Sequence, residues 1–342
     1  STLTSTPTGT TTLTISATAT GITINPITVT LTVLPYGTAT EIFVGNHAPG
    51  PSTFITVSRF LGDADGDVSP ASEFYGDNAN AVARDASGNI YVASDTGNRI
   101  RVYAPGSVGF APPIREIIGR ATKVHRPTGL ALDGQGNLYV AERGGPTNQS
   151  AVLKFAPGAD GDVAPIAIIP SRIPVTGEVA GVNTRMDIAS GVAVDAAGSI
   201  YVVTCQEPQR PGDSKLLIFA PGANGDVAPV VEITNDLNEP QQVTLDEDEN
   251  IYITNRGGVS AITVYAAAPT ANVTPVRTIT SADLSDPFGV AVDGAGRIFV
   301  AETALHSILV FDTGASGSVV PFRKIQGSST GLNRPLGIAV RF

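Results

Sequence analysis

The side chains best suited to chemistry in this sequence are three histidines. They are His47, His125 and His306, and neutral imidazoles of this kind bind divalent metal ions. Such a site requires the three side chains to reach one point. Because no carboxylate or tyrosine recurs at a fixed offset beside them, the alternative interpretation is three isolated surface histidines.

A run of aspartates is a second candidate for metal chemistry. Asp63, Asp65 and Asp67 alternate with Ala and Gly, as in the first half of a calcium-binding loop. No glutamate follows at the spacing that an EF-hand loop requires. Related strings, ADGD at 159–162 and ANGD at 223–226, occupy corresponding places in the chain, so a recurrent hairpin turn is the simpler explanation. We therefore predict no cofactor and keep calcium or another divalent cation as the alternative.

Nucleophilic catalysis requires a nucleophile, a base and an acid that are brought together. We identify no such set in the sequence. Cys205 is the single cysteine, so it cannot form an intramolecular disulfide, and no histidine lies near it in the sequence. The sequence therefore predicts no catalytic and no cofactor-binding residues.

A repeated strand pattern must position these side chains. One phrase occurs five times, as AVARDASGNIYV from Ala81, GLALDGQGNLYV from Gly129, GVAVDAAGSIYV from Gly191, QVTLDEDENIYI from Gln242 and GVAVDGAGRIFV from Gly289. Each copy predicts two strands joined by a tight turn, because Asp can bind the backbone two residues on and Gly accepts a positive φ. In the fourth copy Glu249 replaces this Gly, so we expect that turn to differ.

A second phrase follows each copy of the first and completes a unit of four strands. It is typified by KFAPGADGDVAPIAII from Lys154, which predicts a third strand, a Gly/Asp turn and an outer fourth strand. The recurrent proline near the start of the fourth strand is tolerated at an edge, where its missing N–H would face solvent. Four strands per repeat define a propeller blade.

The two ends of the chain supply complementary pieces of one further blade. Residues 337–342, GIAVRF, form a first strand with no partner after it, and residues 40–47, TEIFVGNH, form a second strand with no first strand before it. Residues 59–74 add a third and a fourth strand. We therefore predict an all-β fold in which residues 37–342 form a six-bladed β-propeller, closed by N- and C-terminal strands in one blade.

In these repeats the chain resembles the NHL-repeat family of six-bladed propellers, over residues 39–342. The resemblance implies the architecture but not an activity, because such propellers include lyases, lactonases, RNA-binding domains and extracellular sensor or adhesion modules. Loops from second to third strands, and from fourth strands to the next blade, share one face, here called the variable face. The Asp-x-x-Gly turns lie on the opposite face, here called the turn face. All three histidines map to the variable face.

A narrower resemblance is to the senescence-marker/gluconolactonase family. That family holds a divalent cation in its central channel with Glu, Asn and Asp side chains. Glu142, Asn255 and Glu302 follow their second strands at equivalent offsets, and Asn46 does so in the composite blade. The resemblance implies that these side chains would bind the cation. The chain departs from the family elsewhere, because the family's N-terminal Glu motif has no match.

Residues 1–36 form a separate, Thr-rich β-strand segment. Leu13 and Ile15 share one face of a predicted strand, and Val29, Leu31 and Val33 share a face of another. The segment resembles the last hairpin of a bacterial immunoglobulin-like domain. These five residues are candidate assembly residues. Their apolar faces could be covered by an upstream domain, by the chain's own propeller, or by a neighbouring molecule in strand donation, which would produce a filament.

Composition excludes some partners. The net charge is −10 and charged residues make up only 15% of the chain, so neither nucleic acid nor an anionic membrane surface is an expected partner. No apolar run approaches the ~20 residues of a membrane span. The chain begins with Ser1 rather than Met, and we expect processing after secretion. Two glycosylation sequons begin at Asn148 and Asn272.

Together these features predict a secreted or cell-surface structural or adhesive propeller without enzymatic activity. Its expected partners are copies of itself or other surface proteins and glycans, and its N-terminal strands would assemble a filament. The alternative is a metal-dependent propeller enzyme, a lactonase or a lyase.

Overall fold

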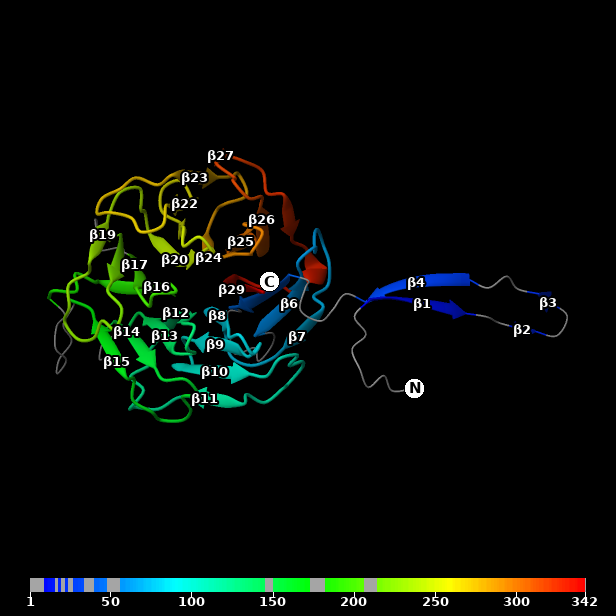
Figure 1. Ribbon diagram of the computed structural model, residues 1–342, viewed down its shortest axis with the longest axis horizontal. Helices are drawn as coiled ribbons and strands as arrows, with labels where there is room; N and C mark the ends of the chain where they lie inside the picture. Colours follow the sequence, from blue (N-terminus) through cyan, green and yellow to red (C-terminus); the bar gives the residue numbers. More distant parts are fainter. Residues whose placement is uncertain are drawn as a thin grey trace.

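The computed structural model shows six sheets of strands arranged around one central axis (Figure 1). It describes residues 40–47, 56–144, 150–172, 182–205 and 214–341, together with short strands between residues 9 and 33. Within these residues the one helical element is a 3₁₀ turn, η1 (Ser328–Thr330). The predicted all-β, six-bladed propeller is therefore confirmed.

Each blade runs from an inner strand at the axis to an outer strand at the rim, with antiparallel neighbours. Blade 1 contains β29 (Pro335–Arg341), β5 (Glu41–Asn46), β6 (Val57–Leu61) and β7 (Ser72–Phe74). Blade 2 contains β8 (Ala81–Arg84), β9 (Ile90–Ser94), β10 (Arg99–Tyr103) and β11 (Arg115–Ile117). Blade 3 contains β12 (Pro127–Leu132), β13 (Leu138–Glu142), β14 (Ala151–Phe155) and β15 (Ala167–Pro170).

The second half of the ring repeats this order. Blade 4 contains β16 (Ile188–Val194), β17 (Ile200–Cys205), β18 (Lys215–Phe219) and β19 (Val231–Ile233). Blade 5 contains β20 (Pro240–Leu245), β21 (Ile251–Asn255), β22 (Ala261–Tyr265) and β23 (Arg277–Thr280). Blade 6 contains β24 (Pro287–Val292), β25 (Ile298–Glu302), β26 (Ser307–Phe311) and β28 (Arg323–Ile325). A short strand of blade 6, β27 (Gly317–Ser318), pairs in parallel with β23 of blade 5.

The ring is closed inside blade 1 by strands from opposite ends of the chain. Strand β29 pairs with β5, with Ile338 opposite Val44 and Val340 opposite Ile42. Strand β5 then pairs with β6 in the same sheet. The predicted closure is confirmed, and it leaves no inner strand without a partner.

The hydrophobic core lies between the blades rather than within one central layer. Six clusters of buried side chains form, one at each interface between neighbouring blades. The cluster between blades 6 and 1, for example, joins Phe299 and Val310 to Ile42 and Phe60. Because each blade contributes to two clusters, removal of one blade would expose apolar surface on both of its neighbours.

The first turn in each of blades 2 to 6 is built around one aspartate. In blade 3, Asp133 Oδ1 accepts the backbone N–H groups of Gln135 and Asn137, and its Oδ2 accepts the Tyr139 hydroxyl at 3.2 Å. Burial raises the pKa of Asp133, but these hydrogen bonds outweigh it, and the pKa lies below its usual range. The Asp-x-x-Gly phrase therefore predicts this turn because its side chain satisfies the turn's donors.

The turn of blade 5 corrects one expectation from the sequence. Glu249 forms the same turn as the glycines, with its N–H 3.0 Å from the Asp246 carbonyl oxygen, and it adopts a φ of 62° to do so. The pairing of β20 with β21 imposes this geometry on a residue that does not favour it. A left-handed residue other than Gly costs about 1–2 kcal/mol.

The N-terminal segment contains a two-stranded sheet of its own. Strand β1 (Gly9–Ile15) pairs with β4 (Ile27–Val33), and β2 (Thr18–Ala19) pairs with β3 (Ile22–Thr23). The register places Leu13 opposite Val29 and Thr12 opposite Thr30. Apolar residues are thus paired mostly with apolar residues, and Thr with Thr. The predicted strands of this segment are confirmed.

Replacing Glu249 with Gly tests the cost of the left-handed turn. We expect Glu249→Gly to raise the free energy of unfolding by about 1 kcal/mol, because Gly adopts this φ without steric conflict. The matched control is Gly136→Ala in blade 3, where φ is 82° and the nearest atom to an added Cβ is 3.7 Å away. It should lose about 1 kcal/mol. Urea denaturation measures both, and no change in either variant would contradict the assignment.

Candidate functional site

The ends of the second strands form a ring of equivalent positions on the variable face. The six residues are Asn46, Ser94, Glu142, Thr204, Asn255 and Glu302. Three of the four Asn and Glu residues accept one backbone N–H each from the loop that enters their own blade. Glu142 accepts the N–H of His125 at 2.7 Å, Asn255 that of Asn238 at 3.0 Å, and Asn46 that of Asn333 at 3.0 Å.

Glu302 makes the most complete contact of this ring. Its two carboxylate oxygens accept the N–H groups of Asp286 at 2.7 Å and Ser285 at 3.1 Å, and the residue is 0% exposed. Burial raises the pKa of Glu302, while the two N–H groups oppose this shift. These carboxylates and amides therefore fasten the interblade loops to the second strands.

The predicted metal ligands are not gathered around one point. His47 Nδ1 lies 3.2 Å from Asn80 Oδ1, and His306 Nδ1 accepts the N–H of Arg334 at 2.9 Å. The described residues contain no group of three or more His, Cys, Asp or Glu side chains placed to hold a metal ion. Of the six candidates, the structure brings together only His125 and Glu142, through the backbone of His125.

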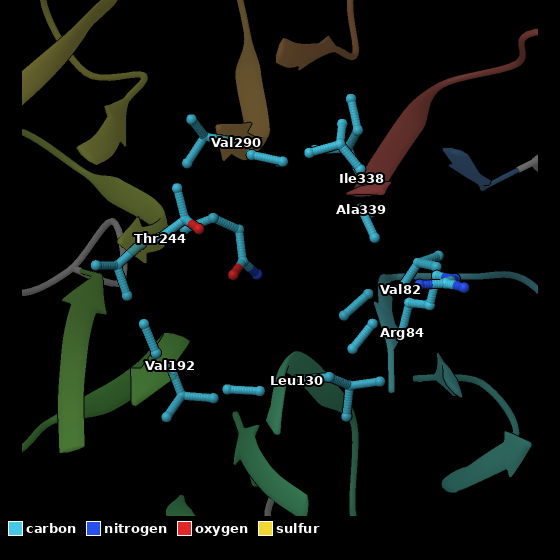
Figure 2. Close-up of a pocket in the computed structure, with 18 of the residues that line it drawn as sticks. Val82, Arg84, Leu130, Val192, Thr244, Val290, Ile338 and Ala339 are labelled. Atoms are coloured by element: carbon cyan, nitrogen blue, oxygen red, sulfur yellow. The ribbon is translucent and has the colours of Figure 1, made fainter. Parts of the chain in front are cut away.

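An axial channel of about 370 Å³ runs between the six inner strands (Figure 2). Val82, Leu130, Val192, Val290 and Ile338 are among the side chains around it. Among the described residues that line the channel, only Arg84, Gln242 and Thr244 have polar side chains, and none of them is a carboxylate. The residues present therefore do not fit the channel cation that the gluconolactonase resemblance implies, because Glu142, Asn255 and Glu302 lie outside the lining.

Close packing around the axis explains the small residues that begin the inner strands. A Cβ on Gly289 would lie 2.3 Å from the Leu336 carbonyl oxygen, and one on Gly337 would lie 2.7 Å from the Val82 nitrogen. Both distances are shorter than any real contact, so these blades approach their neighbours only because the residues have no side chain. Blades 2 and 5 differ, because Ala81 and Gln242 occupy the corresponding positions.

The aspartate strings form hydrogen bonds between blades instead of a calcium loop. We call each set of these hydrogen bonds, from the backbone N–H groups of one blade to the turn of the next, a clasp. Asp65 Oδ1 accepts the N–H of Lys324 at 2.9 Å, in the outer strand of the preceding blade, and Asp67 Oδ1 accepts the N–H of Ser329 at 2.7 Å. Between them, the Gly66 N–H donates to the Lys324 carbonyl oxygen at 2.9 Å. The second and third carboxylates of the string, Asp65 and Asp67, are thus already engaged by backbone donors.

The same clasp recurs around the ring. Asp160 and Asp162 bind the N–H groups of Glu116 and Ala121 at 2.9 and 2.7 Å. In blade 4 the neutral Asn224 takes the place of the first Asp and binds the N–H of Ile168 at 3.0 Å. Because an amide serves as well as a carboxylate, the position requires a hydrogen-bond acceptor rather than a metal-binding charge.

The clasp at Asp67 contains a serine motif that was not among the predicted sites. Residues 327–331 read Gly-Ser-Ser-Thr-Gly and match the spacing Gly-x-Ser-x-Gly, the nucleophile elbow of α/β-hydrolases. Here Thr330 Oγ1 donates to the Gly327 carbonyl oxygen, as Thr122 does to Gly119 in the corresponding turn between blades 2 and 3. Ala121 occupies the place of Ser329 in that turn, so the string serves the interblade turn.

On the variable face, two side chains of blade 3 carry polar groups for which the described residues provide no partner. His125 Nδ1 is enclosed, and no described residue forms a hydrogen bond with it. Arg143 is half-buried, and none of the described carboxylates pairs with its guanidinium. The backbone joins the two residues, since His125 binds Glu142 and the Arg143 N–H donates to the Arg126 carbonyl oxygen at 3.2 Å. We call His125 and Arg143 the blade 3 pair.

Cys205 lies close to this pair in the neighbouring blade. It is buried, and burial raises the pKa of its thiol, although the charges of Arg143 and Arg256 oppose the shift. A raised pKa keeps the thiol protonated at neutral pH, so Cys205 is a poor nucleophile. The Arg143 guanidinium is nevertheless near enough to act on it electrostatically.

The remaining sequence candidates have the following places. Asn148 lies outside the described residues. Asn272 is exposed and takes the glycine's place in the clasp of blade 5, where its φ is 56° and its N–H donates to the Glu232 carbonyl oxygen at 3.2 Å. Leu13, Ile15, Val29, Leu31 and Val33 lie in the paired strands β1 and β4.

Known structures share this fold at low sequence identity. A Bacteroides caccae protein of unknown function is 11% identical with a TM-score of 0.60, over 89% of this chain and 99% of its own. A periplasmic gluconolactonase from Pseudomonas aeruginosa is 15% identical with a TM-score of 0.59, over 89% and 99%. A Bacteroides fragilis protein assigned as a 6-phosphogluconolactonase is 16% identical with a TM-score of 0.56, over 89% and 98%.

These similarities define the class of the protein, a β-propeller, and show the fold alone. No protein-family model matches the chain, and no curated protein matches its sequence. The described residues include no helix of the length and apolar character needed to cross a membrane.

Substitution of Glu302 tests whether the second-strand ring is structural. We expect Glu302→Ala to lower the free energy of unfolding by about 2–4 kcal/mol, because two buried N–H groups lose their acceptor. Glu302→Asn, which introduces the side chain found at the equivalent positions 46 and 255, should cost less than half as much. Because the pKa of Glu302 is raised, protonation favours the folded chain, so the wild type should gain stability relative to Glu302→Asn as the pH falls from 7 toward 4.5. Equal stability of the wild type and Glu302→Ala would contradict the structural role.

Proposed function

We propose that this chain is a β-propeller hydrolase that opens a sugar-acid lactone on its variable face. The observation that carries the proposal is the blade 3 pair. The backbones of His125 and Arg143 are joined through Glu142 and Arg126, yet His125 Nδ1 has no hydrogen-bond partner among the described residues and no described carboxylate pairs with the Arg143 guanidinium. The names of two structural neighbours, a gluconolactonase and a protein assigned as a 6-phosphogluconolactonase, suggest the substrate class. The assignment to the NHL-repeat family, to which the repeat phrase is similar, belongs to the same proposal.

An imidazole that the fold does not use is the feature that separates His125 from the other histidines. His47 and His306 each make a hydrogen bond through Nδ1, whereas His125 makes none to a described residue. An enclosed polar atom without a partner costs about 1–3 kcal/mol, and such a group calls for a functional explanation. An imidazole ring can accept and release a proton, and histidine is the residue that most often acts as a general base.

The two side chains of the pair supply complementary parts of ester hydrolysis. His125 would take a proton from water as the water oxygen bonds to the lactone carbonyl carbon. Arg143 would stabilise the negative charge that develops on the carbonyl oxygen. The bond between this carbon and the ring oxygen then breaks, and the ring oxygen receives the proton from His125. No step uses a metal ion, in line with the poor fit of the channel residues to a cation.

Hydrolysis of glucono-1,5-lactone by the full chain, followed by acid release, tests the proposal. We expect His125→Asn to lower kcat/KM by about 10²–10⁴, the usual contribution of a general base, and Arg143→Gln by about 10²–10³. Arg126→Gln is the matched control, because Arg126 is exposed, follows His125 in the sequence and has no part in the proposed steps. No acceleration over spontaneous hydrolysis, or equal rates in the wild type and His125→Asn, would refute the proposal.

A second candidate function is assembly through the N-terminal strands. The observation that favours it is the two-stranded sheet of β1 and β4, because such a sheet is marginally stable alone and has two open edges. We infer that β1 and β4 pair with a second copy of the chain outside the cell, with Leu13, Ile15, Val29, Leu31 and Val33 in the contact. An immunoglobulin-like domain completed by upstream sequence would be the alternative cover for these strands.

Removal of residues 1–35 separates these outcomes. We expect the intact chain to form oligomers or filaments in light scattering and electron micrographs, and the shortened chain to be a monomer with an unchanged propeller. The melting temperature of the shortened chain, which retains β5 and β29, serves as the control for its fold. A monodisperse intact monomer would contradict assembly through these strands.

A further inference from the structure

The axial channel differs at its two ends, and the difference comes from Gln242. The inner strands run from the variable face toward the turn face. Gln242 lies in the first half of β20 and is therefore near the variable-face end of the channel. Its Nε2 donates to the carbonyl oxygens of Thr128 at 2.6 Å and Ser190 at 3.2 Å, in blades 3 and 4. The side chain therefore links three blades across that end of the channel.

The orientation of the Gln242 amide is fixed by these contacts. The amide nitrogen is a donor and the amide oxygen is an acceptor, so the atom that faces the two carbonyl oxygens must be Nε2. Oε1 therefore points away from them. A Cβ on Gly191 would lie 2.9 Å from Oε1, which shows that a residue without a side chain makes room for the amide. No described residue donates to Oε1. The Gln242 end of the channel thus presents one hydrogen-bond acceptor.

The middle of the channel is apolar. Alanines recur at one position of the inner strands, as at Ala131 and Ala339, with Thr244 in their place in blade 5. Water gains few hydrogen bonds in such a space, whereas aliphatic groups can enter it. The volume of about 370 Å³ lies within the range of small-molecule cavities, which is about 300–1,000 Å³.

The turn-face end carries charged groups of both signs. Arg84 lies there, with Nη2 beside the turn at Gly88. Aspartates of the first turns surround this end, one from each of blades 2 to 6, at Asp85, Asp133, Asp195, Asp246 and Asp293. Lys154 pairs with Asp133 at 3.7 Å and Arg297 with Asp293 at 2.6 Å, so cations offset part of this negative charge.

We propose that the axial channel binds an unbranched aliphatic molecule with one hydroxyl group. The molecule enters from the turn face, its chain lies along the Val, Leu, Ile and Ala side chains, and its hydroxyl donates to Gln242 Oε1. Figure 2 shows the labelled side chains arranged around the space that the aliphatic chain would fill. This site is separate from the blade 3 pair and does not depend on the proposed hydrolase activity.

The test is calorimetric titration of the full chain with primary alkanols from butan-1-ol to octan-1-ol. Each added methylene should tighten binding roughly fourfold until the channel is filled, since a buried methylene contributes a fixed free energy. Octanoate should bind more weakly than octan-1-ol, because its ionised carboxylate has no proton to donate to Gln242 Oε1 and would lose its hydration in the channel. Affinity that does not depend on chain length, or octanoate that binds more tightly, would overturn the proposal.

Paired variants place the ligand in the channel. Thr244 faces the channel, and Thr244→Leu should weaken octan-1-ol binding by at least tenfold by filling the space, whereas the nearly isosteric Thr244→Val should bind as the wild type does. Gln242→Leu should weaken alkanols roughly two- to tenfold and keep the dependence on chain length. Melting temperatures confirm that each variant folds. If Thr244→Leu and Gln242→Leu both fold and bind octan-1-ol like the wild type, the channel is not the site.

Discussion

The structure depends on the crowding of six inner strands around one axis. A Cβ on Gly129, Gly191, Gly289 or Gly337 would approach the neighbouring blade to 3.0 Å or less, so the start of these strands excludes side chains. The crowding also requires a complete ring, since each inner strand packs against the next. The chain meets this requirement by returning its last strand, β29, to pair with β5.

A closed ring determines where function can lie. The space between blades is filled by six apolar clusters, and the outer strands are tied to neighbouring blades by clasps. Polar side chains that could have been ligands, such as Glu142 and Glu302, are engaged with backbone donors that hold the loops. What remains is a small set of unengaged groups on the variable face and the channel that the inner strands enclose.

Much of the fold could be predicted from the sequence because its determinants are local. The Asp-x-x-Gly phrase carries its own turn, and the unpaired strands at 40–47 and 337–342 could be matched without knowledge of distant contacts. The acceptors of the clasps could not be assigned, because Asp65 binds an N–H that lies in another blade and is distant in sequence. A run of aspartates therefore looked like a metal loop. Glu249 shows the opposite case, in which strand pairing overrides the preference of a single residue.

The candidate site was the least predictable part for a related reason. His47, His125 and His306 cannot be distinguished by the sequence. In the structure, His47 and His306 each make a hydrogen bond through Nδ1, and His125 Nδ1 has no partner among the described residues. Arg143 carried no signal, because an arginine after a strand is common on any protein surface. The channel could not be predicted from the sequence either. The role of Gln242 depends on its hydrogen bonds to carbonyl oxygens in blades 3 and 4, which are distant in the sequence.

The central claim is that the terminal strand closes the propeller into one cooperative unit. Native-state hydrogen exchange of the full chain tests it most directly. The amides of β29 and β5 that join Ile338 to Val44 and Val340 to Ile42 should exchange with the same free energy as amides in the central strands of blades 3 and 4, because opening of the ring unfolds the whole. Exchange of the β29 amides at a much lower free energy, with the other blades still protected, would show that the propeller is stable without this strand.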